Sequence, residues 1–176
     1  MPTHLLHVLH ARIIRVHILG YEREGGLLSV IWQNAEYFIS TEKVLLDFPL
    51  IFRFISEESY WGKGRTVVTM RRAIENSILC FGLYRKTDTV PVQAGFARVV
   101  SDLAAFAYLS DIFVLSEYRG KSLGKWLVST ICEHPEIRDL KNVTLITRTP
   151  EFYEPFSFFV HDQANVRKFM MRVKPS

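Results

Sequence analysis

The segment EYRGKSLGKWLV, residues 117 to 128, limits the folds open to this chain more than any other stretch. It joins an apolar run that ends at Leu115 to a run in which apolar residues recur with helical spacing. Between them, Gly120 and Gly124 stand among basic residues, as in a turn from a strand into the first turn of a helix. Backbone N–H groups and the helix dipole favour an anion at such a place. The segment therefore predicts a strand, turn and helix that bind a phosphate or pyrophosphate, with a cationic surface turn as the plainer alternative.

Two common phosphate-binding motifs do not fit this segment. A Walker P-loop needs four residues between its glycines, whereas Gly120 and Gly124 enclose three. Trp126 also stands where that motif has a magnesium-binding hydroxyl. The dinucleotide motif GxGxxG fails as well, because Lys121 and Ser122 interrupt it.

The rest of the chain predicts a mixed sheet with helices. The expected strands are 35–41, 77–85, 91–100, 106–115, 143–147, 156–160 and 166–173, and the expected helices are about 50–61, 66–76 and 122–133. Short connections between the strands 77–85, 91–100 and 106–115 predict an antiparallel meander. The strand 143–147 is a short apolar run after a helix, which is typical of a parallel neighbour. Thr149 and Pro150 predict the start of a last helix, which Pro155 limits to about one turn.

Residues 1–34 form a predicted extension to a domain that spans 35–176. The extension has no acidic residue before Glu22 and two β-branched runs, so it predicts either an extra hairpin or a poorly ordered segment. A mitochondrial presequence is a third reading, although the segment is poor in serine. We expect a cytoplasmic protein and leave a mitochondrial location open.

The overall composition excludes several classes of function. No apolar stretch reaches the roughly 20 residues that cross a bilayer. Cys80 and Cys132 stand apart without the spacing of a zinc site, so we expect no bound metal. A net charge of +4 is spread along the chain rather than gathered in a stripe, which argues against nucleic-acid binding.

The turn and its surroundings resemble the GNAT superfamily of acyl-CoA-dependent N-acyltransferases. Its motif Q/R-x-x-G-x-G/A matches the six residues from Arg119 to Gly124, with Ser122 in place of the usual glycine. The order of FGLY, GFARVVSD, FAYLSDIFVLSEYRGKSLGKWLV, LITR and FYEPFSF is also similar to the family core, over about residues 36–174. The resemblance implies an α/β (α+β) fold with a mixed, mostly antiparallel sheet flanked by helices. The sheet would splay between the fourth and fifth core strands.

By the same resemblance, the co-substrate is acetyl-CoA. Its pantetheine arm would bond to the strand before the motif, and its phosphates would lie in the turn. The implied residues are Ile112, Phe113 and Val114 on the strand, and Arg119, Gly120, Lys121, Ser122, Leu123, Gly124 and Lys125 in the turn. The hydroxyl of Ser122 would donate to a phosphate or cap the helix.

The resemblance also implies catalytic and acceptor-binding residues. Tyr153 matches the tyrosine that protonates the leaving thiolate, and a plain aromatic cluster is its alternative. Asp111 or Tyr108 would be the base, with a bound water or a purely structural carboxylate as alternatives. The acceptor pocket would include Tyr60, Trp61 and Arg65.

The resulting hypothesis is an enzyme that transfers acetyl from acetyl-CoA to a primary amine by direct attack in a ternary complex. The acceptor would be a small molecule or a peptide, and the protein would be a monomer or a homodimer. A catalytically silent CoA-binding domain is the alternative.

Overall fold

A computed structural model of the 176-residue chain describes residues 15–17 and 31–160. One seven-stranded sheet runs through this part of the chain in the sequential order β1 to β7. All neighbouring pairs are antiparallel except β6 and β7, which are parallel. The strands are β1 (Arg15–His17), β2 (Ile31–Asn34), β3 (Tyr37–Ser40), β4 (Leu79–Arg85), β5 (Val92–Ser101), β6 (Phe106–Val114) and β7 (Asn142–Thr144).

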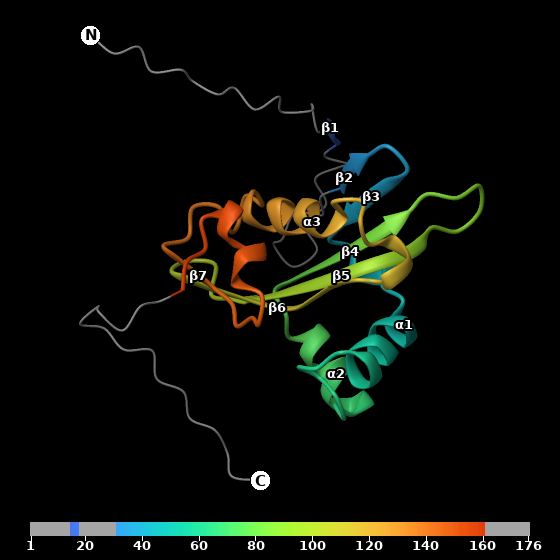
Figure 1. The fold of residues 1–176 in the computed structure, drawn as a ribbon, viewed down its shortest axis with the longest axis horizontal. Coiled ribbons are helices and arrows are strands. Elements are labelled where there is room, and N and C mark those ends of the chain that lie inside the picture. The colour runs from blue at the N-terminus through green and yellow to red at the C-terminus, as the bar shows by residue number, and fades with distance from the viewer. Residues whose placement is uncertain (1–14, 18–30, 161–176) are drawn as a thin grey trace.

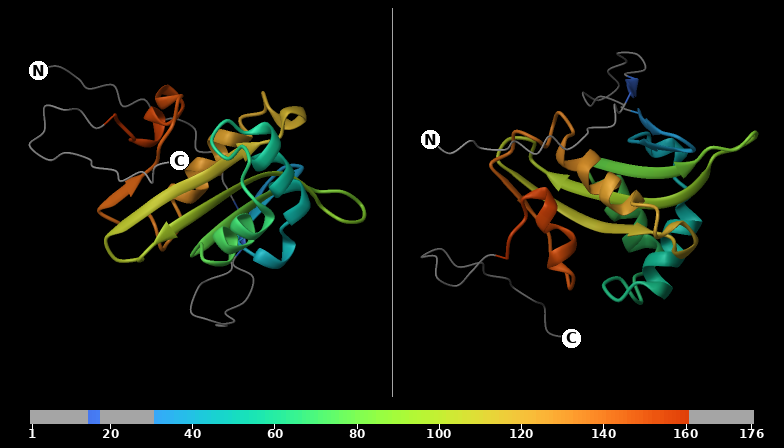
Figure 2. Two further views of the ribbon diagram at one scale, coloured as in Figure 1. Left: turned by 90° about the horizontal axis from the view of Figure 1, so that it is seen from below. Right: turned by 45° about the horizontal axis from the view of Figure 1, so that its top comes forward.

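Helices cover both faces of the sheet, as Figures 1 and 2 show. The helix α3 (Leu123–Cys132) packs on one face, and α1 (Phe48–Arg53) and α2 (Val67–Glu75) pack on the other. Each face has its own buried apolar cluster, because successive side chains of a strand point to opposite sides. Leu127 and Ile131 belong to the cluster under α3, and Ile51 and Met70 belong to the cluster under α1 and α2.

Local sequence signals account for where the helices begin. The side chain of Asp47 accepts a hydrogen bond from the N–H of Leu50 at the start of α1, and Thr66 accepts one from Thr69 at the start of α2. After Arg53 the chain continues through one wider helical turn, Phe54–Glu58. The structure thus has helices where the sequence predicts them. It also confirms the antiparallel meander of β4, β5 and β6 and the parallel pairing of β6 with β7, although β7 is shorter than predicted.

Two predictions near the ends of the domain need comment. No residue of the predicted strand 156–160 is in a strand, because Phe156 ends the second of two 3-10 turns, Pro150–Phe152 and Glu154–Phe156, and Ser157 then adopts a left-handed φ of 64°. The strand predicted at 166–173 lies outside the described residues. β1 and β2 do pair as a hairpin would, and β2 joins the sheet through β3. The boundary at residue 34 remains a prediction.

Candidate active site

The turn before α3 takes its shape from two residues with positive φ. Gly120 has a φ of 76° and Ser122 a φ of 59°, and α3 begins at the next residue, Leu123. A Cβ on Gly120 would meet no atom within 4 Å, so the outer side of the turn is open. The Ser122 side chain does not cap α3, which corrects that part of its predicted role. Serine here occupies a conformation that glycine adopts without steric cost.

Basic side chains tie this turn to the sheet. Arg119 Nε donates to the carbonyl oxygen of Val114 over 3.0 Å, and Lys121 Nζ donates to the hydroxyl of Tyr37 over 3.2 Å. Lys125 is exposed, and its ammonium has no partner among the described residues. The turn is therefore held against the ends of β6 and β3, with positive charge around its open side.

The edge of β6 next to β7 is open beyond Tyr108. β7 pairs only with Phe106, Ala107 and Tyr108, so residues from Leu109 onward have no strand on that side within the described chain. Backbone groups alternate between the two neighbours of a strand. Because the N–H of Leu115 bonds to β5, Val114 faces the open edge and Phe113 faces β5.

Of the three predicted backbone contacts on β6, Phe113 therefore needs revision. A Cβ on Gly95 of β5 would lie 2.6 Å from the Phe113 carbonyl oxygen, so this carbonyl abuts β5. The ring of Phe113 stacks on Phe54 at 4.0 Å on the side of α1. Val114 stays at the open edge, and Ile112 lines the cavity described below.

A bulge interrupts the middle of β6. Phe96 pairs with Phe113 but Arg98 pairs with Ser110, so β6 has one extra residue there. Asp111 occupies the bulge with a left-handed φ of 53°. The bulge breaks the strict alternation of side chains, which allows Tyr108 and Asp111 to line one cavity.

The carboxylate of Asp111 is fully buried and accepts three hydrogen bonds. Oδ2 accepts from Arg98 Nε over 2.6 Å and from Arg65 Nη1 over 2.7 Å, and Oδ1 accepts from Trp61 Nε1 over 3.1 Å. This network joins the bulge of β6 to the loop between α1 and α2, which carries Trp61 and Arg65.

A cavity of about 290 Å³ lies at this junction. Its lining includes all six residues predicted for catalysis and acceptor binding: Tyr60, Trp61, Arg65, Tyr108, Asp111 and Tyr153. It also includes Ile112, which was predicted to contact the co-substrate, and residues to which the sequence gave no role, which are Leu109, Ser110, Leu145, Ile146, Thr147 and Arg148. The segment after β7 supplies four of these. These four residues are the LITR stretch that the family resemblance includes, but no role in the site was predicted for them.

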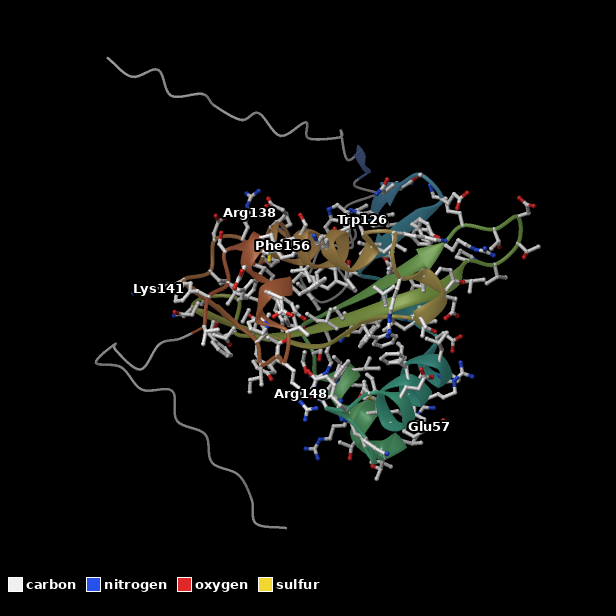
Figure 3. All side chains as sticks on the ribbon, in the orientation of Figure 1. Glu57, Trp126, Arg138, Lys141, Arg148 and Phe156 are labelled. Atoms are coloured by element: carbon white, nitrogen blue, oxygen red, sulfur yellow. The ribbon has the colours of Figure 1, made fainter. Side chains whose placement is uncertain are left out.

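Arg148 closes one side of this cavity against Tyr60. Its guanidinium lies over the Tyr60 ring, 4.1 Å from the centroid, and its backbone N–H donates to the Tyr60 hydroxyl over 3.3 Å. Tyr60 in turn meets Trp61 edge to face at 5.0 Å. Figure 3 shows Arg148 directed toward the side of the molecule formed by α1 and α2.

Tyr153 lies between the two 3-10 turns that follow Pro150. Burial raises the pKa of its hydroxyl above the ordinary value, and nearby Tyr60 acts in the same direction. The hydroxyl has no hydrogen-bond partner among the described residues, and the ring meets Phe152 and Phe158 edge to face. Tyr153 thus keeps its proton and faces a cavity in which that proton is available to a ligand.

Gly124 brings the turn and the Tyr153 segment together. A Cβ at this position would lie 3.3 Å from Phe152 Cζ and 3.8 Å from Val114 Cγ2. The first turn of α3 therefore contacts both the end of β6 and the residue that precedes Tyr153. Gly124 thus links the end of β6 to the segment that carries Tyr153, a residue of the cavity lining.

Neither a metal cluster nor a membrane helix accompanies this site. Within residues 15–17 and 31–160, no three His, Cys, Asp or Glu side chains are grouped as metal ligands. In the same part of the chain, no helix is long and apolar enough to span a bilayer.

Comparisons with known proteins agree with this geometry. The family model for an acetyltransferase (GNAT) domain matches residues 76–158. A protein of Gibberella zeae that carries the name of an acetyltransferase is 29% identical over 116 residues, which are 58% of this chain and 66% of the relative. The match thus spans just under two thirds of that relative's length.

Solved structures extend the comparison. A protein of Xanthomonas campestris pv. campestris assigned to the GNAT family is 36% identical with a TM-score of 0.66, over 76% of this chain and 93% of the other. A Mycobacterium tuberculosis protein solved in complex with CoA has a TM-score of 0.57 at 16% identity, over 73% and 75% of the two chains. At 16% identity, the likeness to the Mycobacterium tuberculosis protein shows only that the two chains share a fold.

Proposed function

The chain belongs to the GNAT superfamily of N-acetyltransferases, and we propose that it transfers an acetyl group from acetyl-CoA to a primary amine by direct attack in a ternary complex. The observation that carries the proposal is that the turn contacts both the open edge of β6 and the segment of Tyr153. Arg119 ties the turn to Val114 at the open edge of β6, and Gly124 abuts Phe152 next to Tyr153. A ligand that lies along this edge reaches from the turn into the cavity.

The residues of the turn fit the phosphates of CoA. Gly120 leaves the outer side of the turn free, and Lys125 supplies a cation without a partner in the described chain. The N-terminus of α3 adds backbone donors and a favourable dipole. CoA bound in the Mycobacterium tuberculosis relative is consistent with this assignment.

The thioester end of acetyl-CoA would lie near the β6 edge and Tyr153. Val114 directs its N–H to the open edge, where an extended arm can pair with the strand as a further strand would. During transfer, the acceptor nitrogen forms a bond to the acetyl carbon while the bond from that carbon to sulfur breaks. Tyr153 holds a proton that the leaving thiolate can take.

We assign Asp111 a positioning role rather than that of the base. Its two oxygens already accept from Arg65, Arg98 and Trp61, and two of these donors are cations. If Asp111 took a proton from the acceptor amine, its carboxylate would lose its charge and both ion pairs would weaken. Tyr108 lies in the cavity without a hydrogen-bond partner among the described residues, but a phenol is a weak base. We therefore propose that the amine enters in its neutral form and later loses its proton to water.

A thermal shift experiment with CoA and acetyl-CoA tests the co-substrate. Ligand that binds only the folded protein at one hundred times its dissociation constant stabilises the fold by about 2.7 kcal/mol. The test variant is Lys125→Glu and its matched control is Lys141→Glu. Both lysines are exposed, but only Lys125 lies in the first turn of α3, next to the glycine turn. We expect Lys125→Glu to weaken the shift. No shift in wild type at millimolar CoA would contradict the proposal.

A further inference from the structure

The charges around the cavity sum to an excess of positive charge. Arg65, Arg98 and Asp111 form one cluster with two cations and one anion. Arg148 adds a further cation, and Asp111 is the only carboxylate that the described residues contribute to the lining. A site for a cationic acceptor, such as a polyamine, would need carboxylates that this lining lacks.

Arg148 is placed to bind an anion. Its guanidinium carbon lies over the Tyr60 ring, 4.1 Å from the centroid, and its side-chain N–H groups have no hydrogen-bond partner among the described residues. None of these groups pairs with a carboxylate in the described chain. The backbone N–H of Arg148 is bonded to the Tyr60 hydroxyl, which fixes the arginine relative to the cavity wall. A planar edge with parallel donors suits the two oxygens of a carboxylate or a phosphate.

Arg65 strengthens the same preference. Its Nη1 donates to Asp111, while its Nε and Nη2 have no partner in the part of the chain described. The side chain is 21% exposed, so its charge is only partly screened by solvent. A cavity of about 290 Å³ is at the small end for ligand sites, which favours a small acceptor over a folded protein surface.

Resting on the proposed acetyl transfer, we propose that the acceptor is a small primary amine that carries a carboxylate or a phosphate, and that Arg148 binds this anionic group. Positive charge near the amine also favours its neutral, nucleophilic form, because a cation close by disfavours a second one. The same lining thus selects the acceptor and prepares it for attack.

The test compares acceptors that differ only in the anion. Release of CoA thiol from acetyl-CoA is measured with phenylalanine against phenylalaninamide, and with glucosamine 6-phosphate against glucosamine, while spermidine serves as a cationic amine. The first pair tests a carboxylate and the second a phosphate. We expect the anionic member of at least one pair to have a kcat/KM about tenfold higher or more, since a charge-assisted hydrogen bond contributes about that factor.

Two variants locate the effect. Arg148→Gln should remove most of the preference for the anionic member. Arg138→Gln should keep the preference, because Arg138 is an exposed arginine on another side of the molecule (Figure 3) and pairs only with Asp139. Equal preferences in both variants, or spermidine as the best acceptor, would overturn the proposal.

A binding readout separates this inference from acetyl transfer itself. The thermal shift of the CoA-bound protein is measured with each member of the two pairs. A larger thermal shift with an anionic member supports the inference even without turnover. The inference is overturned if neither anionic amine exceeds its neutral partner in thermal shift or in kcat/KM. Turnover of neutral amines alone would leave acetyl transfer intact and remove the inference, whereas failure of the proposed function would appear as no CoA shift and no turnover.

Discussion

The carboxylate of Asp111 and the guanidinium of Arg65 form a 2.7 Å ion pair that joins the bulge of β6 to the loop between α1 and α2. The bulge lies on the strand whose open edge would hold acetyl-CoA, and the loop carries one wall of the cavity. The pair therefore fixes the two halves of the candidate site relative to each other. Arg98 on β5 completes the arrangement with a second ion pair of 2.6 Å.

Asp111→Asn should destabilise the fold strongly. The change keeps the size of the side chain but leaves Arg65 and Arg98, both mostly buried, without their anion. Loss of one partner of a buried ion pair costs about 3–5 kcal/mol. Equilibrium unfolding in urea measures the loss. Asp139→Asn is the control, because its ion pair with Arg138 is exposed and should contribute little. Equal unfolding midpoints for the two variants would refute the structural importance of the network.

Ser122→Gly should keep CoA binding and should not destabilise the protein. Ser122 has a φ of 59°, which costs a residue with a Cβ about 1–2 kcal/mol, and its side chain does not cap α3. Ser129→Gly within α3 makes the same chemical change at a helical position, where glycine costs about 1 kcal/mol. Thermal unfolding should therefore rank Ser122→Gly above Ser129→Gly. The reverse order would mean that the Ser122 hydroxyl has a structural role.

Periodicity and turn signals predicted most of the fold. The helical spacing of apolar residues from Leu123 to Ile131 predicts α3, and the short connections around β5 predict the antiparallel meander. Both signals lie in residues that are close together in the sequence. The helix expected at 66–76 was confirmed for the same reason, and Thr66 caps it. The strand predicted at 156–160 was wrong, because an apolar run does not determine the backbone conformation: Ser157 turns left-handed there, and Phe159 and Val160 are exposed.

The site was partly visible in the sequence. The resemblance to the GNAT superfamily pointed to Tyr108, Asp111 and Tyr153, which line one cavity. The left-handed conformations of Asp111 and Ser122 gave no signal, since neither residue is glycine. Arg148 could not be found either, because its contact with Tyr60 spans 88 positions of the chain and depends on tertiary packing.

Acidification should destabilise the protein through His134. This side chain is fully buried against the Trp32 and Phe81 rings, and burial lowers its pKa from 6.5 to about 4. Below pH 6.5 the unfolded chain binds a proton that the folded protein does not, so stability falls until about pH 4. The loss through this group is on the order of 3 kcal/mol.

Urea unfolding at several pH values between 7 and 4 measures this loss. His134→Asn is the comparison, since asparagine can still accept from the N–H of Glu136 but does not titrate. Its unfolding free energy should depend less on pH over this range. Parallel pH profiles for wild type and variant would show that other groups are responsible.

Tyr153→Phe should lower turnover while acetyl-CoA still binds. The variant keeps the ring that packs against Phe152 and Phe158, and it removes a hydroxyl that has no partner among the described residues. General acid assistance contributes about 10²–10⁴-fold, and the lower end is expected because a thiolate is a good leaving group. Steady-state kinetics with any accepted amine gives kcat, and calorimetry gives the dissociation constant of acetyl-CoA.

Tyr84→Phe is the control for this prediction. The Tyr84 hydroxyl is buried on β4 without a hydrogen-bond partner among the described residues, and Tyr84 does not line the cavity. Activity should therefore persist in this variant, and the fold should be no less stable. If Tyr153→Phe turned over at the wild-type rate, Tyr153 would belong to the aromatic cluster only, and the thiolate would take its proton from water.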